Sequence, residues 1–199
     1  MNYKRLSTLV LWTTALLVSV PGIAAATTAT SPSGTTYTST ISGSSEGHMI
    51  FHDTSGLGLT SECNSAFSMN LESHGAGVTA SGKISSLTFS NCTNSTHVTV
   101  LKGGFVTYHS IAGTKNSTET STGKEVTELN TSTGIHCIWT TNNTHWGTLI
   151  PNEVTGSNAT LQINATMQRT GGTSGFFCGS SRTWTGSYKI TTPASLSFD

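Results

Sequence analysis

Strict alternation of apolar and polar residues is the feature that most constrains how this chain can fold. From residue 159 to residue 167 every second side chain is apolar, and the residues between them are Thr, Gln or Asn. Residues 183–190 repeat this two-residue period. Side chains of a β-strand point alternately to the two faces of a sheet, so each run predicts an antiparallel strand with one buried face. No segment after residue 26 shows a convincing helical period, and the chain is therefore expected to be all-β.

Glycine-containing turn signals separate the strand-like runs at intervals of about 8–12 residues, a spacing typical of sandwiches and barrels. Such pairs stand at 55–56, 81–82, 103–104, 122–123 and 171–172. We therefore expect an antiparallel β-sandwich or flattened barrel of about ten to twelve strands. A chain of 199 residues has the length of one such domain.

The N-terminal region has the organisation of a secretory signal. Lys4 and Arg5 precede an apolar stretch over residues 9–20, which Pro21 ends, and three alanines follow. We expect a signal peptide over 1–26 that is cleaved after Ala26, a flexible leader over 27–35 and a single domain over 36–199. The apolar stretch is shorter than the about 20 residues of a spanning helix, so we expect no transmembrane segment after cleavage. The mature protein is expected to be secreted, to the extracellular space or the cell envelope.

Four cysteines, Cys63, Cys92, Cys137 and Cys178, follow the expected signal peptide. An even number of cysteines in an exported chain predicts disulfides. Three pairings are possible, and we favour Cys63–Cys92 with Cys137–Cys178 because each pair then brackets a run of strand-like sequence. The other two pairings stay open. No two cysteines have the C-x-x-C spacing of a metal site, so structural disulfides are the expected role.

The charge of the chain excludes one class of partner. Charged residues make up 9% of the sequence, against about 25% in an average domain. Loss of Lys4 and Arg5 leaves seven basic and nine acidic side chains, a formal net charge of −2 with His neutral. Nucleic-acid binding needs clustered Lys and Arg, so we expect no nucleic-acid partner. Composition does not identify the partner. We expect a cell-surface, polymeric or apolar ligand, and we expect no cofactor.

Two segments carry a resemblance to known sequences. Residues 84–92 read Ile-Ser-Ser-Leu-Thr-Phe-Ser-Asn-Cys, and residues 177–188 run from Phe-Cys to Trp-Thr-Gly-Ser-Tyr. With the strands around them they resemble a group of uncharacterised secreted all-β proteins of bacteria, of the actinobacterial type, over about residues 36–195. A fainter similarity is to the secreted activators of alkane oxidation. The first resemblance implies an all-β fold without a function, and the second implies a helper at the cell surface.

The sequence gives little support for catalytic or metal-binding residues. Residues 43–47 match the G-x-S-x-G pattern around Ser45, but that motif needs the strand-to-helix turn of an α/β sheet. His48 and His52 are four residues apart, which in a strand places them on one face but about 13 Å apart, too far for a shared metal ion. No pair of carboxylates has a spacing that suggests general acid–base work. We therefore predict no catalytic, cofactor-binding or metal-binding residues, and no enzyme.

The large aromatic residues are expected to pack in the core beside the disulfides, with an exposed binding platform as the alternative. These residues are Tyr108, Trp139, Trp146, Trp184 and Tyr188. Three functions follow as hypotheses. The first is an accessory or binding protein of the cell surface or extracellular space, which contacts an apolar or polymeric ligand. The alternatives are an extracellular hydrolase and a structural or adhesive subunit that assembles by strand exchange.

Overall fold

The structure is a computed structural model of the chain, and the part of the chain that it describes begins at Ala29. It describes residues 29–30, 36–37, 39–73, 79–94, 96–152, 157–173, 176–194 and 196–198. The predicted signal peptide, 1–26, lies outside the described residues, as do 27–28 and 31–35 of the predicted leader. Within these described ranges, no helix is long and apolar enough to cross a membrane.

Every long regular element in the described ranges is a β-strand. The strands are β1 (Ala29–Thr30), β2 (Thr40–Ser45), β3 (Met49–Asp53), β4 (Thr60–Ser73), β5 (Ser81–Ser90), β6 (Thr96–Lys102), β7 (Phe105–Ser110), β8 (Ser117–Thr122), β9 (Glu125–Asn130), β10 (Ile135–Thr140), β11 (Thr144–Ile150), β12 (Thr160–Gly172), β13 (Ser181–Thr192) and β14 (Ser197–Phe198). The predicted all-β fold class is confirmed.

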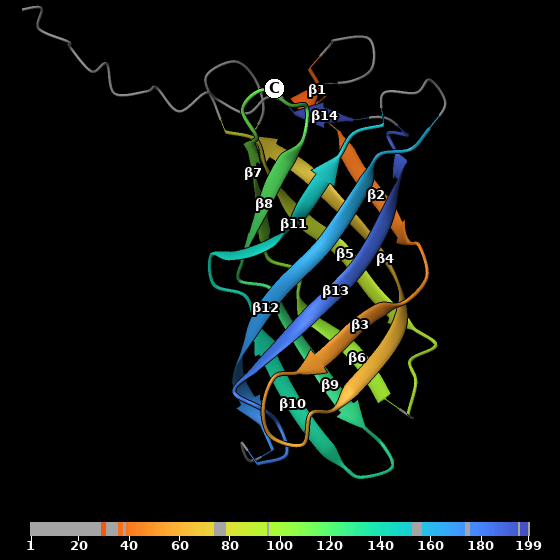
Figure 1. Cartoon of the computed structure of the whole chain (residues 1–199), viewed down its shortest axis with the longest axis vertical. Coiled ribbons are helices and arrows are strands. Elements are labelled where there is room, and N and C mark those ends of the chain that lie inside the picture. Colours follow the sequence, from red (N-terminus) through yellow and green to blue (C-terminus); the bar gives the residue numbers. More distant parts are fainter. Residues whose placement is uncertain are drawn as a thin grey trace, which may run out of the picture.

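Twelve of the strands form one antiparallel sheet that curves into an uneven ring (Figure 1). Four pairs of consecutive strands, β2–β3, β6–β7, β8–β9 and β10–β11, each behave as one long strand interrupted by two or three residues. Together with β4, β5, β12 and β13 they make eight long strands that follow the ring in chain order. The ring closes where β13 pairs with β2 and β3. β6 contacts β5 without a backbone ladder between the described residues, so the wall is uneven there.

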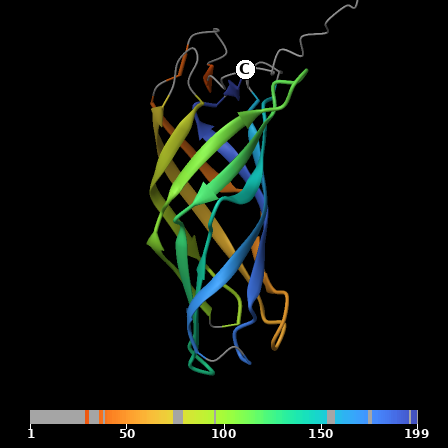
Figure 2. The same ribbon diagram turned by 90° about the vertical axis from the view of Figure 1, so that its left-hand side faces the viewer.

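The two ends of the ring differ (Figure 2). At the terminal end, β1 pairs with β14, and Ala29 and Leu196 are buried. At the opposite end lie the connections from β3 to β4, β5 to β6, β9 to β10 and β12 to β13 (Figure 1). We call this second end the loop end. Its connections come from widely separated parts of the sequence, and they surround the candidate site.

Aromatic side chains fill the interior of the ring. The ring centroids of Phe67 and Tyr188 lie 4.9 Å apart, and those of Phe51 and Trp184 lie 5.4 Å apart. Trp184 lies directly opposite Phe51 in the ladder between β13 and β3, whereas Phe67 on β4 and Tyr188 on β13 stand on the two strands that flank β2. Both pairs make the edge-to-face or stacked contacts that stabilise aromatic cores. The predicted core role is confirmed for all five large aromatic residues, since each is at most 1% exposed: Tyr108, Trp139, Trp146, Trp184 and Tyr188.

Two disulfides connect the wall of the ring to its loop end. The structure has the pairing favoured from the sequence, Cys63–Cys92 and Cys137–Cys178. The first ties the beginning of β4 to the segment after β5. The second ties β10 to the connection between β12 and β13.

Removing the second disulfide is expected to lower the free energy of unfolding by about 3 kcal/mol. The bridge closes a loop of 41 residues between Cys137 and Cys178 and so restricts the unfolded chain. The change is the double variant Cys137→Ser/Cys178→Ser, measured by urea denaturation at pH 7. Unchanged stability in the double variant would contradict the expectation.

Candidate functional site

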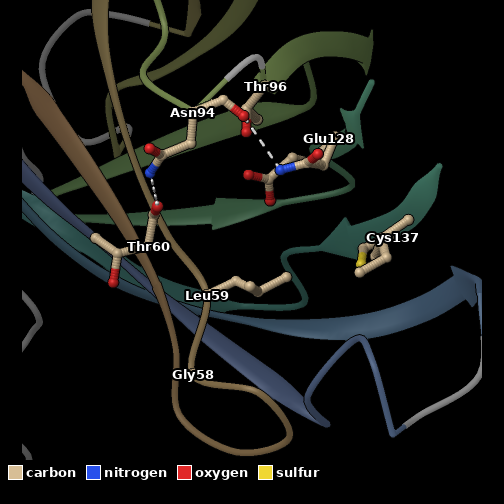
Figure 3. Close-up of a pocket in the computed structure, with 9 residues that line it drawn as sticks. Gly58, Leu59, Thr60, Asn94, Thr96, Glu128 and Cys137 are labelled. Carbon is tan, nitrogen blue, oxygen red and sulfur yellow. Dashed lines mark hydrogen bonds between the residues drawn. The ribbon is translucent and has the colours of Figure 1, made fainter. Parts of the chain in front are cut away.

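A pocket of about 360 Å³ opens at the loop end of the ring (Figure 3). Four segments supply its wall: the β3–β4 connection with the first residue of β4, the β5–β6 connection with the first residue of β6, strand β9 and strand β10. Its lining residues are Gly58, Leu59, Thr60, Asn94, Thr96, Glu128, Asn130, Ile135 and Cys137. The volume lies within the range of small-molecule sites in proteins, about 300–1,000 Å³.

Asn94 fixes one side of the pocket by bridging two strands. Its side-chain amide donates to the carbonyl of Thr60 over 3.3 Å, and its own carbonyl accepts from the Asn130 side chain over 3.2 Å. Asn94 has a φ of 58°, a left-handed conformation that Asn tolerates better than most residues. Backbone hydrogen bonding between Thr93 and Glu62 anchors the same segment to β4. This segment therefore links β4 to β9 at the loop end.

A buried arginine holds the carboxylate of the pocket. Arg182, which is 1% exposed, donates from Nη2 to Glu128 Oε1 over 3.1 Å, and its Nη1 forms an ion pair with Glu128 Oε2. The Ser61 hydroxyl donates to the same Oε1 over 2.8 Å. Arg182 Nη2 also donates to the carbonyl of Phe51 over 3.3 Å. These contacts fix the position of the Glu128 side chain where it lines the pocket.

Asp53 is the second carboxylate beside this guanidinium. Its Oδ1 lies 3.3 Å from Arg182 Nε, and both side chains are 1% exposed. Burial raises the pKa of Asp53, an effect that the charge of Arg182 opposes. Burial also lowers the pKa of Arg182 to about 10, well above neutral pH. One positive charge thus faces two carboxyl groups, of which Glu128 lines the pocket and Asp53 does not.

The lining combines hydrogen-bonding groups with small apolar surfaces. Thr60, Asn94, Thr96, Glu128 and Asn130 contribute hydroxyl, amide and carboxylate groups. The remaining side chains are apolar, and Cys137 is held in its disulfide. Such a surface can hold a ligand by several directed hydrogen bonds with apolar contact between them. Glu128 is the one carboxylate among the lining residues.

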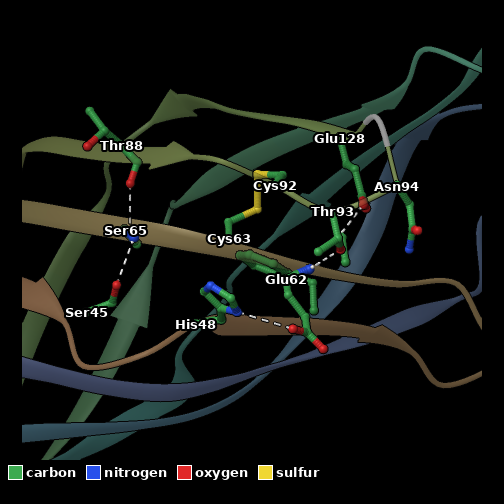
Figure 4. Close-up of a disulfide and its surroundings, with 12 residues drawn as sticks. Ser45, His48, Glu62, Cys63, Ser65, Thr88, Cys92, Thr93, Asn94 and Glu128 are labelled. Atoms are coloured by element: carbon green, nitrogen blue, oxygen red, sulfur yellow. Dashed lines mark hydrogen bonds and ion pairs between the residues drawn. A yellow bond between two sulfur atoms is a disulfide. The ribbon is translucent and has the colours of Figure 1, made fainter.

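Residues 43–47, which carry the G-x-S-x-G match, are not among the lining residues of the pocket. Figure 4 shows the surroundings of Ser45 and His48. Ser45 ends β2, and its hydroxyl accepts from the backbone N–H of Ser65 over 3.0 Å. His48 Nδ1 lies 3.3 Å from Glu62 Oε2, and both side chains are about half exposed. His52 contacts the Thr60 hydroxyl over 2.8 Å. Within the described ranges, no three His, Cys, Asp or Glu side chains gather as metal ligands.

A second buried charged pair lies inside the ring and was not identified from the sequence. Glu119 on β8 and Lys124 after β8 are both 0% exposed, and neither the carboxylate oxygens nor Nζ has a hydrogen-bond partner among the described residues. Lys124 Nζ lies 3.4 Å from the centroid of the Trp146 ring. Burial raises the pKa of Glu119 to about 8, while Lys124 opposes the rise. Burial likewise lowers the pKa of Lys124 well below its usual value.

The alternating pattern contained a signal for several of these charges. Arg182 has the same parity as Trp184 and Tyr188 on β13, so the pattern places it on the inward face. Asp53 shares the inward parity of Phe51 on β3 in the same way. A charged residue at a position where an alternating strand otherwise has apolar residues therefore indicates a buried charge.

Fold and site together define the class: a disulfide-bonded, antiparallel all-β domain. Disulfides form and persist in oxidising compartments, so the two bridges are consistent with an extracellular protein. Comparison with protein-family models, curated proteins and solved structures gave no match. The resemblances stated from the sequence therefore stay predictions.

Proposed function

We propose that this chain is an exported, non-catalytic binding domain that acts at the cell surface or outside the cell. We further propose that its ligand is an uncharged, hydroxyl-rich group, such as a sugar unit of a surface polymer. The observation that carries the proposal is the pocket at the loop end, with its fixed carboxylate, two amides and two hydroxyls.

The chemistry of the lining supports this ligand class. Hydroxyl groups of a ligand can donate to Glu128, whose negative charge is already compensated by Arg182. They can also exchange hydrogen bonds with the amides and hydroxyls of the wall. Leu59 and Ile135 offer apolar contact to the C–H faces between those hydroxyls. A sugar unit presents this combination of groups and is small enough for a pocket of about 360 Å³.

A titration followed by NMR tests the proposal. Neutral monosaccharides and disaccharides are added to the isotope-labelled mature protein, and amide chemical shifts are recorded. We expect at least one sugar to shift resonances of the residues around the pocket, such as Thr96 and Asn130. Leu59→Trp should fill the pocket and weaken binding about tenfold or more. Leu101→Trp, at an exposed position outside the pocket lining, is the matched control and should bind as the parent does.

Two results would contradict the proposal. In the first, no neutral sugar shifts the pocket resonances. In the second, tetramethylammonium shifts them and the sugars do not, which would show that the floor of the pocket takes a cation.

An extracellular hydrolase is the second candidate, and one observation favours it: the exposed contact between His48 and Glu62 near Ser45. A serine hydrolase also needs the serine hydroxyl against the imidazole. The Ser45 hydroxyl instead accepts from Ser65. A fluorophosphonate probe separates the candidates, because a hydrolase that uses Ser45 would be labelled and the Ser45→Ala variant would not.

A further inference from the structure

Three exposed apolar side chains stand at the loop end of the ring. Leu57, in the β3–β4 connection, is 48% exposed. Phe176 and Phe177, in the β12–β13 connection, are 69% and 37% exposed, and their ring centroids lie 5.3 Å apart. We call these three residues the apolar tip. The two connections meet, because a Cβ on Gly56 would lie 3.0 Å from the carbonyl oxygen of Phe176.

Hydrogen bonds and a disulfide hold the two connections of the apolar tip together. The backbone N–H of Ser180 donates to the Ser55 hydroxyl over 2.9 Å, and that of Thr54 donates to the carbonyl of Ser181 over 3.1 Å. Cys178, next to Phe177, is bonded to β10 through Cys137. The backbone that carries these apolar side chains is therefore held in place. Their exposure to water is nevertheless unfavourable, because apolar surface is more stable when it is buried.

The two connections of the apolar tip contain no charged residue of their own, and a charged side chain that contacts one of them is Arg169 of β12, which donates to the carbonyl of Thr173 over 3.2 Å. Residues 54–60 and 170–181 contain no Asp, Glu, Lys, Arg or His. A second exposed apolar pair, Leu101 and Phe105, differs in this respect. Lys102 adjoins Leu101, and Lys83 Nζ lies 5.9 Å from the Phe105 ring centroid. The two groups of exposed apolar residues thus differ in charge, because lysines adjoin Leu101 and Phe105 and none stands in the connections of the apolar tip.

We propose that the apolar tip docks on the surface of a neutral lipid bilayer. Phe and Leu side chains insert into the boundary between headgroups and acyl chains, to a depth of about 5–10 Å. Attraction to anionic lipids depends on basic residues, and the two connections of the tip have none. A stable contact with a second copy needs about 1,000 Å² or more of buried surface, which three side chains on narrow loops do not supply.

Docking through the tip would also orient the pocket. Gly58 and Leu59 line the pocket and follow directly after Leu57 in the same connection. A molecule that rests on its apolar tip therefore turns the pocket towards the lipid surface. The docking proposal does not depend on the ligand of the pocket, since the tip residues are not among the lining.

Vesicle flotation tests the proposal with the processed protein. The probe is unilamellar vesicles of phosphatidylcholine, and the variant is Phe176→Ser/Phe177→Ser. We expect the parent protein to float with the vesicles. Binding should be unchanged in 0.5 M NaCl, a concentration at which the Debye length is below about 5 Å and attraction between charges is largely screened. The double variant should partition at least about tenfold more weakly. Circular dichroism and thermal unfolding establish that the variant is folded.

The matched control is Leu101→Ser/Phe105→Ser, which removes the exposed apolar pair beside the lysines. It should float like the parent. The proposal is overturned if the parent does not bind the neutral vesicles at lipid excess, or if the control loses as much binding as the tip variant. It is equally overturned if binding requires phosphatidylglycerol, or if the tip substitutions abolish a dimer instead of vesicle binding.

Discussion

Arg182→Met is expected to lower the free energy of unfolding by about 3–5 kcal/mol, as measured by urea denaturation at pH 7. The guanidinium is 1% exposed and lies against two carboxyl groups, those of Asp53 and Glu128. Methionine fills a similar volume, but it leaves both carboxyl groups buried without a cation. Removal of one partner from a buried ion pair is costly for this reason, even where the intact pair contributes little.

Two further variants make this result specific. Lys102→Met removes an exposed ion pair with Glu125, 2.8 Å long, and should change stability by less than about 1 kcal/mol. In Arg182→Met/Asp53→Asn/Glu128→Gln the uncompensated charges are gone, so most of the lost stability should return. An Arg182→Met protein as stable as the parent would show that the buried charges are compensated in another way.

The second large effect concerns Glu119 and pH. Burial raises the pKa of this carboxyl to about 8 in the folded protein, from an unfolded value of 4.5. The folded state therefore binds more protons than the unfolded state between these values. Its contribution to stability is fully present below about pH 4.5 and is lost as pH rises through about 8. At 1.36 kcal/mol for each pKa unit, the loss is on the order of 4 kcal/mol.

Glu119→Gln removes this titration. Glutamine keeps the shape of the side chain but does not titrate, and Lys124, whose pKa the charge of Glu119 raises, is present in both proteins. The stability of the parent relative to the variant should fall steadily when urea denaturation is repeated from pH 4.5 to pH 8. Thr120→Val, at a position of β8 that faces outward, is the control and should not alter the pH dependence. A parent–variant difference that stays flat over this range would show that Glu119 keeps an ordinary pKa.

Much of the fold followed from the two-residue period. The alternation from residue 159 to 167 predicts one buried face, and Leu161, Ile163 and Met167 are indeed buried on β12. The interruption of long strands was harder to foresee. Gly104 and Gly123 both have positive φ values and stand between collinear strands, where they turn the backbone without reversing it. A Gly-containing turn signal does not by itself distinguish such an interruption from a hairpin.

The candidate site was predictable only in part. The cysteines were identified and their pairing was favoured correctly, because the strand-like sequence between them restricts the choice. The pocket joins Leu59, Asn94, Glu128 and Cys137, and nothing local in the sequence relates these four residues. Their proximity is a consequence of ring closure, in which the register between β13 and β3 places Arg182 opposite Asp53.

The strand order around the ring also bears on how the chain reaches its folded state. Each long strand pairs with the strand that precedes it in the chain, so seven of the eight contacts can form between near neighbours. The eighth joins β13 to β2 and β3, and it brings together residues such as Trp184 and Phe51 that are more than 130 positions apart. Loop-closure entropy opposes such a distant contact most strongly. We therefore expect an open meander to form first and ring closure to be the late, slow step that assembles the buried charge cluster.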